Sequence, residues 1–142
     1  MSELTYLSLG TNLGDREANI RRAVELIKQR VGEVVRCSSL HVTEPWGFSS
    51  SNLFVNAAIA VQTELSPWQL LETTQQIERE MGRQQKSSDG IYYDRIIDID
   101  ILLYGDLALS TPTLIIPHPH MQEREFVQKP LQEILDTKSS IT

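Results

Sequence analysis

Hydrophobic residues recur every three or four positions in two segments, which is the period of an amphipathic helix. The first segment is residues 16–31, with Asp15 as its predicted N-cap and Gly32 as its predicted stop. The second segment, residues 66–81, opens with Ser-Pro-Trp-Gln, which has capping-box spacing and places proline at the first helical position. A final helix is expected near residues 122–135.

Four other segments alternate polar and apolar residues or are rich in β-branched residues. They predict strands over residues 4–9, 34–42, 53–63 and 96–104, with a turn over residues 10–15. In the last strand the alternation places two aspartates, Asp98 and Asp100, on one face. The residues expected on the opposite face are Ile97, Ile99, Ile101 and Leu103.

The order of these elements is β-α-β-β-α-β. It indicates an α+β fold of the ferredoxin-like type, an antiparallel sheet with helices packed on it, two of them on one face. The length of 142 residues fits one compact domain, so residues 1–142 are expected to form a single unit. Fold alone does not indicate function, because this architecture hosts many activities.

Acidic residues outnumber basic ones by 19 to 13, which gives a formal charge of −6. This balance argues against a broad surface for nucleic acid or an anionic membrane. The start of the chain lacks a secretory signal pattern, and no run approaches the roughly 18–20 apolar residues of a membrane span. We therefore expect a cytoplasmic protein that is a monomer by default. The lone cysteine, Cys37, is expected to be a small buried residue of its strand.

The aspartate pair is the sharpest chemical feature of the chain. Period two puts Asp98 and Asp100 on one face of a strand, about 7 Å apart at their Cα atoms. Two carboxylates that close repel each other, and a divalent cation would remove that cost. Mg²⁺ takes one or two protein carboxylates and completes its shell with water and phosphate oxygens. The alternative is a solvated strand face with two exposed aspartates.

A polar loop precedes this strand, and an arginine stands at each end of it. Arg83 and Arg95 beside a carboxylate pair suggest a clamp for a polyphosphate, with Lys86 between them as a further cation. Each arginine, taken alone, is better explained as a solvated loop side chain. The combination of arginines, polar loop and paired aspartates favours the clamp.

Other polar residues stand at positions that suggest ligand contacts. Gln75 and Glu78 share one helix face and could hold a ribose, a metal-bound water or nothing. Asn56 could read the edge of a heterocycle with Phe54 stacked on its ring, or it could cap a loop. Trp46 could line either a pocket or the core.

Two histidines, His118 and His120, flank a proline, but no third ligand of suitable spacing is near them in sequence. A single histidine that contacts a phosphate is a better reading than a zinc site. No arrangement of residues favours nucleophilic catalysis, and there is no glycine-rich phosphate loop of Walker type. A nucleotide would have to bind in another way.

The chain resembles the 6-hydroxymethyl-7,8-dihydropterin pyrophosphokinases, enzymes of folate biosynthesis, between about Tyr6 and Ile134. The resemblance is carried by six motifs that occur in order: LGTNLG at 9–14, TEPWG at 43–47, FVNAA at 54–58, IEREMGR at 77–83, DRIIDIDI at 94–101 and IPH at 116–118. It implies a ferredoxin-like enzyme that transfers a diphosphate from ATP to the hydroxymethyl group of the pterin and releases AMP. Its partners would be these two small molecules.

The resemblance also implies roles for individual residues. Asp98 and Asp100 match the aspartates that hold two Mg²⁺ ions, and Arg83 and Arg95 match arginines that assist phosphoryl transfer. The positions implied for the pterin are Thr43, Pro45, Trp46, Phe54, Asn56 and Phe126. Those implied for the nucleotide are Gln75, Glu78, Lys86, Ile101, His118 and Arg124.

The loop between the two arginines departs from the common family pattern. It carries less positive charge and is about two residues longer, with Lys86 as the replacement for one missing cation and Tyr92 or Tyr93 for a missing tryptophan. Two alternatives therefore stay open beside the family activity. One is a small-molecule binding module without catalysis, and the other is an enzyme that phosphorylates a different alcohol. The nucleotide product separates them.

Overall fold

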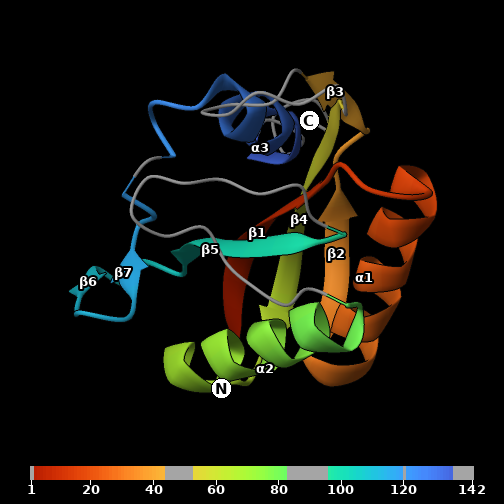
Figure 1. Cartoon of the computed structure of the whole chain (residues 1–142). Coiled ribbons are helices and arrows are strands. Elements are labelled where there is room, and N and C mark those ends of the chain that lie inside the picture. The colour runs from red at the N-terminus through yellow and green to blue at the C-terminus, as the bar shows by residue number, and fades with distance from the viewer. Residues whose placement is uncertain (1, 44–52, 83–95, 120, 136–142) are drawn as a thin grey trace.

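The computed structural model describes residues 2–43, 53–82, 96–119 and 121–135. Its main sheet has the strand order β2-β4-β1-β5, and all neighbouring strands are antiparallel (Figure 1). β3 also pairs with β4, at residues 54–56, whereas β2 pairs with residues 59–63 of the same strand. The strands of this sheet are β1 (Glu3–Thr11), β2 (Gly32–Cys37), β3 (His41–Thr43), β4 (Phe54–Thr63) and β5 (Asp98–Tyr104). A small second sheet pairs β6 (Leu109–Ser110) with β7 (Ile115–Ile116).

Three helices cover the two faces of the main sheet. The helices are α1 (Arg16–Arg30), α2 (Pro67–Glu80) and α3 (Glu125–Leu135). α1 and α2 share one hydrophobic core with the sheet, as predicted, whereas α3 packs into a second core that contains Ala58, Ala60 and Leu102. The fold therefore combines α-helices and an antiparallel β-sheet, with two helices on one face of the sheet and one helix on the other.

The alternation along β4 decides which side chains meet which core. Val55, Ile59 and Val61 pack toward α1 and α2, while the alternating positions Ala58 and Ala60 face α3. Side chains such as Ile59 are fully buried, and each buried aliphatic side chain of this size contributes about 1.5–3 kcal/mol. The central strand β4 therefore supplies both cores at once.

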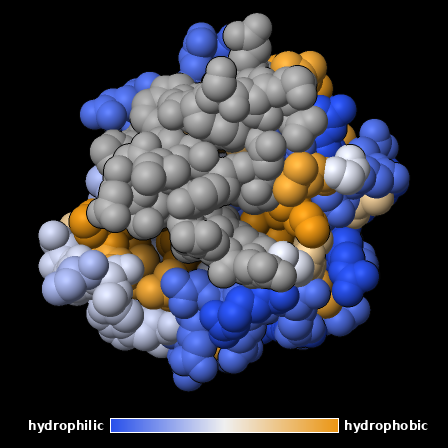
Figure 2. All heavy atoms as spheres, viewed as in Figure 1, coloured by the Kyte–Doolittle hydropathy of each residue, from blue (hydrophilic) through white to orange (hydrophobic). Residues whose placement is uncertain are grey.

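The predicted helix starts are confirmed. Asp15 accepts a 3.1 Å hydrogen bond from Ala18 N–H at the start of α1. In α2, Ser66 Oγ accepts from Gln69 N–H, and the Gln69 side chain accepts from Ser66 N–H, which completes the capping box. The outer residues of α2 are mostly hydrophilic and cover the lower edge of the molecule in Figure 2. Gly82 ends that helix with φ +101°.

Gly32 follows the helix end, as predicted: α1 ends at Arg30, and the N–H of its C-cap Val31 donates to Ile27 O. Gly32 is also the first residue of β2, which the sequence pattern did not predict. A Cβ at Gly32 would lie 2.0 Å from the carbonyl oxygen of Gln62 on β4. Glycine is needed here because the two strands approach too closely for any side chain.

The predicted strand over residues 34–42 is in fact two strands. After Cys37 the hydroxyl of Ser38 accepts a hydrogen bond from Ala58 N–H and donates one to Ser39 O. A serine hydroxyl can replace a backbone group in this way and interrupt a ladder. From Cys37 to His41 the chain advances four residues while β4 moves three, from Ile59 to Asn56, so one residue is extra.

Three smaller expectations are also corrected. β1 continues through Thr11, so Gly10 belongs to the strand and not to the turn. A register shift between β1 and β5 makes Leu102 an extra residue, which turns Leu103 to the α3 side, away from Ile99 and Ile101. Cys37 is exposed, not buried. Among the helices that the structure describes, none has the length and apolar content needed to cross a bilayer.

Candidate active site

A row of three paired residues crosses the sheet on the face that α3 covers. Gly10 on β1 pairs with Asn56 on β4 at one side and with Asp98 on β5 at the other. Directly paired residues point to the same face, so Asn56 and Asp98 project together, about 10 Å apart at their Cα atoms. A Cβ added to Gly10 would lie 3.1 Å from Asn56 Oδ1 and 4.0 Å from a ring carbon of Phe54. A residue without a side chain thus separates the amide from the carboxylate.

The next row of the sheet holds the second aspartate. Ser8 pairs with Ala58 on one side and with Asp100 on the other. Asp98 and Asp100 are both partly exposed, whereas Ile99 between them is buried in the opposite core, so the predicted shared face of the carboxylates is confirmed. Small residues therefore form the floor beside both carboxylates.

The donor set fits a magnesium ion better than a self-contained metal centre. Within the described ranges no group of three or more His, Cys, Asp or Glu side chains gathers to enclose a cation. Two strand carboxylates such as Asp98 and Asp100 would leave most of the coordination shell to water and to phosphate oxygens. That is the usual way in which proteins bind Mg²⁺ together with a nucleotide.

Glu78 holds the backbone between the two aspartates. Its side chain is only 3% exposed, and Oε2 accepts a 2.7 Å hydrogen bond from the N–H of Ile99. β5 is an edge strand among the described strands, so its outward N–H groups need partners from outside the sheet. Glu78 provides one from α2. The alternative of a solvated Glu78 on the helix surface is therefore wrong.

The predicted nucleotide residue Ile101 has its side chain in the core, 5% exposed, on the side of α1 and α2. A contact to a ligand would have to use its backbone. Alternate residues of an antiparallel strand turn their backbone groups the same way, so Ile101 shares the outward direction of the Ile99 N–H. Gln75 lies one turn before Glu78 on α2 and is partly exposed. Of these two helix residues, Glu78 contacts the edge of β5, and Gln75 lies one turn away from it on α2.

Two segments late in the chain bring further predicted residues toward the sheet. The N–H of His118 donates to Leu102 O at 3.0 Å, which places His118 beside β5. The carbonyl of Arg124 accepts hydrogen bonds from the N–H groups of Val127 and Gln128 in the first turn of α3. Its guanidinium carbon lies 5.7 Å from the centre of the Phe126 ring, within the range of a cation–π contact. A predicted nucleotide residue therefore touches a predicted pterin residue.

Part of the predicted site lies outside the described residues. Thr43 ends β3 opposite Phe54, and this backbone pairing is all that the structure describes of it. The other predicted residues that fall outside are Pro45, Trp46, Arg83, Lys86 and Arg95. The described half of the site thus consists of the sheet floor, the edge of β5 and the start of α3.

Gly10 is the residue of the floor that the sequence pattern did not single out. The sequence pattern predicts a turn over residues 10–15 and includes Gly10 in it. A glycine that continues a strand also signals a close approach of another group. Here the approaching group is the Asn56 side chain.

Comparison with known proteins shows the family of this chain. A model of the family "7,8-dihydro-6-hydroxymethylpterin-pyrophosphokinase (HPPK)" matches residues 6–136. The chain belongs to this family. A 2-amino-4-hydroxy-6-hydroxymethyldihydropteridine pyrophosphokinase of Porphyromonas gingivalis is 48% identical over 132 residues, which cover 92% of this chain and 90% of that protein. The pyrophosphokinase of Bacillus subtilis is 44% identical over 135 residues, 94% of this chain and 79% of that one.

A solved structure shares the fold of this chain. The crystal structure of wild-type HPPK-DHPS of Plasmodium falciparum with pteroate superimposes with a TM-score of 0.74 at 17% identity. The match covers 94% of this chain but only 39% of that longer chain. At this identity the likeness concerns the arrangement of the strands and helices alone.

Proposed function

We propose that this chain transfers a diphosphate from ATP to the hydroxymethyl group of 6-hydroxymethyl-7,8-dihydropterin and releases AMP, a step of tetrahydrofolate biosynthesis. Membership of the pyrophosphokinase family supports the activity. The row Asn56–Gly10–Asp98 across three neighbouring strands is the observation that supports this location of the active site. It places the Asn56 amide, which can hydrogen-bond a heterocycle, and the Asp98 carboxylate, which can bind a cation, on one rigid surface of the sheet.

The pterin lies on the Asn56 side of this floor. Its ring carries amide-like edges, which the buried amide of Asn56 can recognise by hydrogen bonds. Phe54 and Phe126 supply aromatic faces for the flat ring. Gly10 leaves the ring room to approach the sheet. Thr43, Pro45 and Trp46 complete the pocket in this proposal.

The triphosphate lies on the side of Asp98 and Asp100. These carboxylates hold Mg²⁺, two ions in our proposal, and the metal supplies neutralisation of the polyphosphate charge. Glu78 keeps the strand backbone between the aspartates fixed through the Ile99 N–H. The nucleotide extends along the edge of β5, where Gln75, the Ile101 backbone, His118 and Arg124 contact it, together with Lys86.

The transfer itself needs no protein nucleophile. The hydroxymethyl oxygen attacks the β-phosphorus, the bond from that phosphorus to the oxygen of the α-phosphate breaks, and the hydroxyl proton is lost. Charge spreads over the transferred phosphates, and Arg83 and Arg95 stabilise it. Catalysis then rests on positioning and electrostatics, which is consistent with a site built from carboxylates, an amide and arginines.

The same proposal extends to the architecture. Strand order β2-β4-β1-β5 with antiparallel neighbours, two helices on one face and the β-α-β-β-α-β order support a ferredoxin-like topology, in which β3 and α3 are additions. A family match over residues 6–136 supports one pyrophosphokinase domain over residues 1–142. This domain acts on small molecules as a monomer.

Nucleotide product analysis tests the activity. Purified protein, ATP, Mg²⁺ and the pterin are incubated, and AMP, ADP and phosphate are resolved, with parallel samples that lack pterin or contain a chelator. We expect AMP that depends on both the pterin and Mg²⁺. Production of ADP would instead indicate a simple kinase on this scaffold. Pterin binding without turnover would indicate a binding module.

A further inference from the structure

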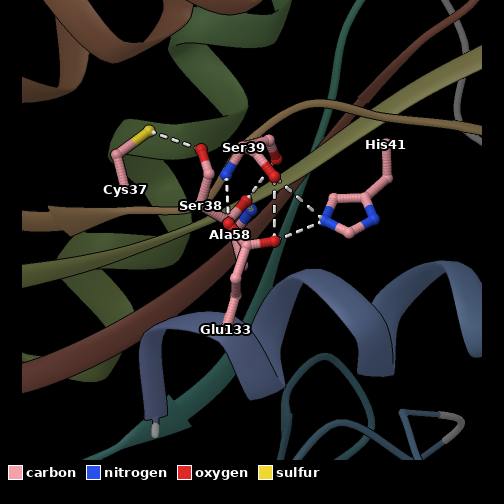
Figure 3. A network of polar contacts seen from close by, with 6 residues as sticks. All are labelled: Cys37, Ser38, Ser39, His41, Ala58 and Glu133. Atoms are coloured by element: carbon pink, nitrogen blue, oxygen red, sulfur yellow. Dashed lines mark hydrogen bonds and ion pairs between the residues drawn. The ribbon is translucent and has the colours of Figure 1, made fainter. Parts of the chain in front are cut away.

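A polar network ties α3 to the short connection between β2 and β3 (Figure 3). Glu133, near the end of α3, is its centre. Its Oε1 accepts a 2.6 Å hydrogen bond from the backbone N–H of Ser39, and its Oε2 accepts one of 2.9 Å from Ser39 Oγ. His41 Nε2 lies 2.6 Å from the same Oε2. One carboxylate thus meets three groups from residues 39–41.

The connection is held from its other side as well. Ser38 N–H donates to Ala58 O at 2.9 Å, and Ser38 Oγ accepts from Ala58 N–H at 2.9 Å. Ser38 therefore fixes this segment to β4 while Glu133 fixes it to α3. Serine hydroxyls and a carboxylate thus hold this segment in place, where a continuous strand would be held by backbone hydrogen bonds.

This network is not arranged for nucleophilic chemistry. A catalytic triad uses the two different nitrogens of histidine for the nucleophile and the acid. Here the same nitrogen, His41 Nε2, faces both Ser39 Oγ at 3.5 Å and Glu133. Partial desolvation and then the charge of Glu133 raise the pKa of the neighbouring Cys37 thiol, which disfavours its reactive thiolate. The network therefore points to positioning rather than to a second reaction.

What the network positions is one wall of the pterin pocket. β3 has only three residues, and they pair with β4 in the register His41–Asn56, Val42–Val55 and Thr43–Phe54. So short a strand is held weakly by its own ladder and depends on anchors at its ends. Glu133 lies seven residues after Phe126, about two turns along the same helix. It joins the strand beside Asn56 to the helix that carries Phe126.

We propose that Glu133 is a positioning residue for the pterin. By binding Ser39 and His41 it holds β3 and α3 in one spacing, so that Asn56 and Phe54 on one side and Phe126 on the other face the ring together. This inference rests on the proposed function for the identity of the ligand. It concerns a residue that touches neither the substrate nor the phosphates in that proposal.

The substitution Glu133→Gln tests it with little change in shape. A carboxamide is uncharged and has one accepting oxygen in place of two. If that oxygen keeps the Ser39 N–H, then Ser39 Oγ and His41 Nε2 must accept from the NH₂ instead of donating, or lose their contact. We expect the KM for the pterin to rise at least about fivefold, with kcat and the KM for ATP within about twofold of wild type. Glu125→Gln is the matched control, because it removes an exposed carboxylate from the same helix.

Two further variants separate positioning from general stability. Ser39→Ala deletes one hydroxyl but keeps the backbone N–H, and should raise the pterin KM less than Glu133→Gln does. His41→Gln keeps a donor near the position of Nε2 and should resemble wild type, while His41→Ala should not. Hydrogen exchange of the β3 amides should accelerate in the variants that raise this KM.

The outcomes distinguish this inference from the proposed function. Wild-type protein that forms AMP, with an unchanged pterin KM in both Glu133→Gln and Ser39→Ala, would overturn the inference alone. An equal rise of the KM for the pterin and the KM for ATP in Glu133→Gln would also overturn the inference, because a purely structural role would affect both substrates alike. Wild-type protein that forms no AMP would overturn the proposed function. Calorimetric titration with the pterin would then still test Glu133, because equal affinity in Glu133→Gln would refute its role.

Discussion

Glu78 Oε2 accepts a 2.7 Å hydrogen bond from the backbone N–H of Ile99, the residue between the two aspartates of the site. The carboxylate is buried, and the strand it meets is the edge of the sheet. A helix therefore fixes the height and orientation of the segment from which both carboxylates project. This hydrogen bond accounts for an acidic residue on the buried side of α2.

Replacement of Glu78 should affect chemistry more than pterin binding. Glu78→Ala leaves the Ile99 N–H without that acceptor, at a cost of about 1–3 kcal/mol in the free energy of unfolding. The aspartates lose their fixed backbone, so kcat for AMP formation should fall at least about tenfold while the pterin Kd changes little. Glu72→Ala, at an exposed position of the same helix, is the control. Urea unfolding and steady-state kinetics measure both effects; unchanged kcat in Glu78→Ala would contradict this account.

Asp98→Ala should abolish metal-dependent turnover without loss of the fold. The substitution removes one of two neighbouring carboxylates, so the like-charge repulsion on that face is relieved. We expect less than about a tenth of the wild-type rate of AMP formation and a thermal midpoint that no longer rises with Mg²⁺ and ATP. Asp106→Ala in the exposed turn after β5 serves as the comparison. Retention of more than that fraction of the rate would refute the two-aspartate metal site.

Gly10→Ala should impair pterin binding selectively. The new Cβ would lie 3.1 Å from Asn56 Oδ1, so the amide has to shift. The protein itself should lose little stability, because alanine is favoured over glycine in a strand interior by roughly 0.5–1 kcal/mol. We expect a severalfold rise in the pterin KM, with the KM for ATP as the internal control. A rise in the KM for ATP without a rise in the KM for the pterin would show that the pterin does not bind next to Gly10.

The contribution of Glu133 to stability should depend on pH. The Ser39 backbone N–H, then His41, hold the pKa of the Glu133 carboxyl below its usual value of 4.5. A carboxyl whose folded pKa is depressed stabilises the fold above its unfolded pKa and loses that contribution as pH falls through the folded pKa. The gap in unfolding free energy between wild type and Glu133→Gln should therefore be constant above about pH 5 and shrink below it. Urea titrations at several pH values measure this gap, and a gap that widens on acidification would be the opposite result.

Local patterns in the sequence predicted the elements that local physics controls. The capping box at Ser66, the N-cap at Asp15 and the alternation of β4 depend on neighbours within a few residues, and all three are confirmed. The shared face of Asp98 and Asp100 follows from the same period of two. These features needed no knowledge of distant contacts.

Features that depend on distant partners could not be read in the same way. Helical spacing shows that Gln75 and Glu78 share a face, but not that the edge of β5 lies against it and buries Glu78. The extra residue at Leu102 depends on the register between β1 and β5. The break after Cys37 arises because Ser38 finds the backbone of Ala58 across the sheet. In each case a tertiary contact overrides a regular local pattern.

The row Asn56–Gly10–Asp98 has a consequence for inhibitor design. The two ends of the row are separated by two strand spacings, about 10 Å, and the distance is fixed by backbone hydrogen bonds rather than by a hinge. A single molecule that joins a pterin to a phosphate mimic would thus need a linker matched to that span, with no bulky group where it crosses Gly10. Because the floor is part of the sheet itself, such a molecule would meet a preorganised surface and lose less entropy on binding than one that must order its site.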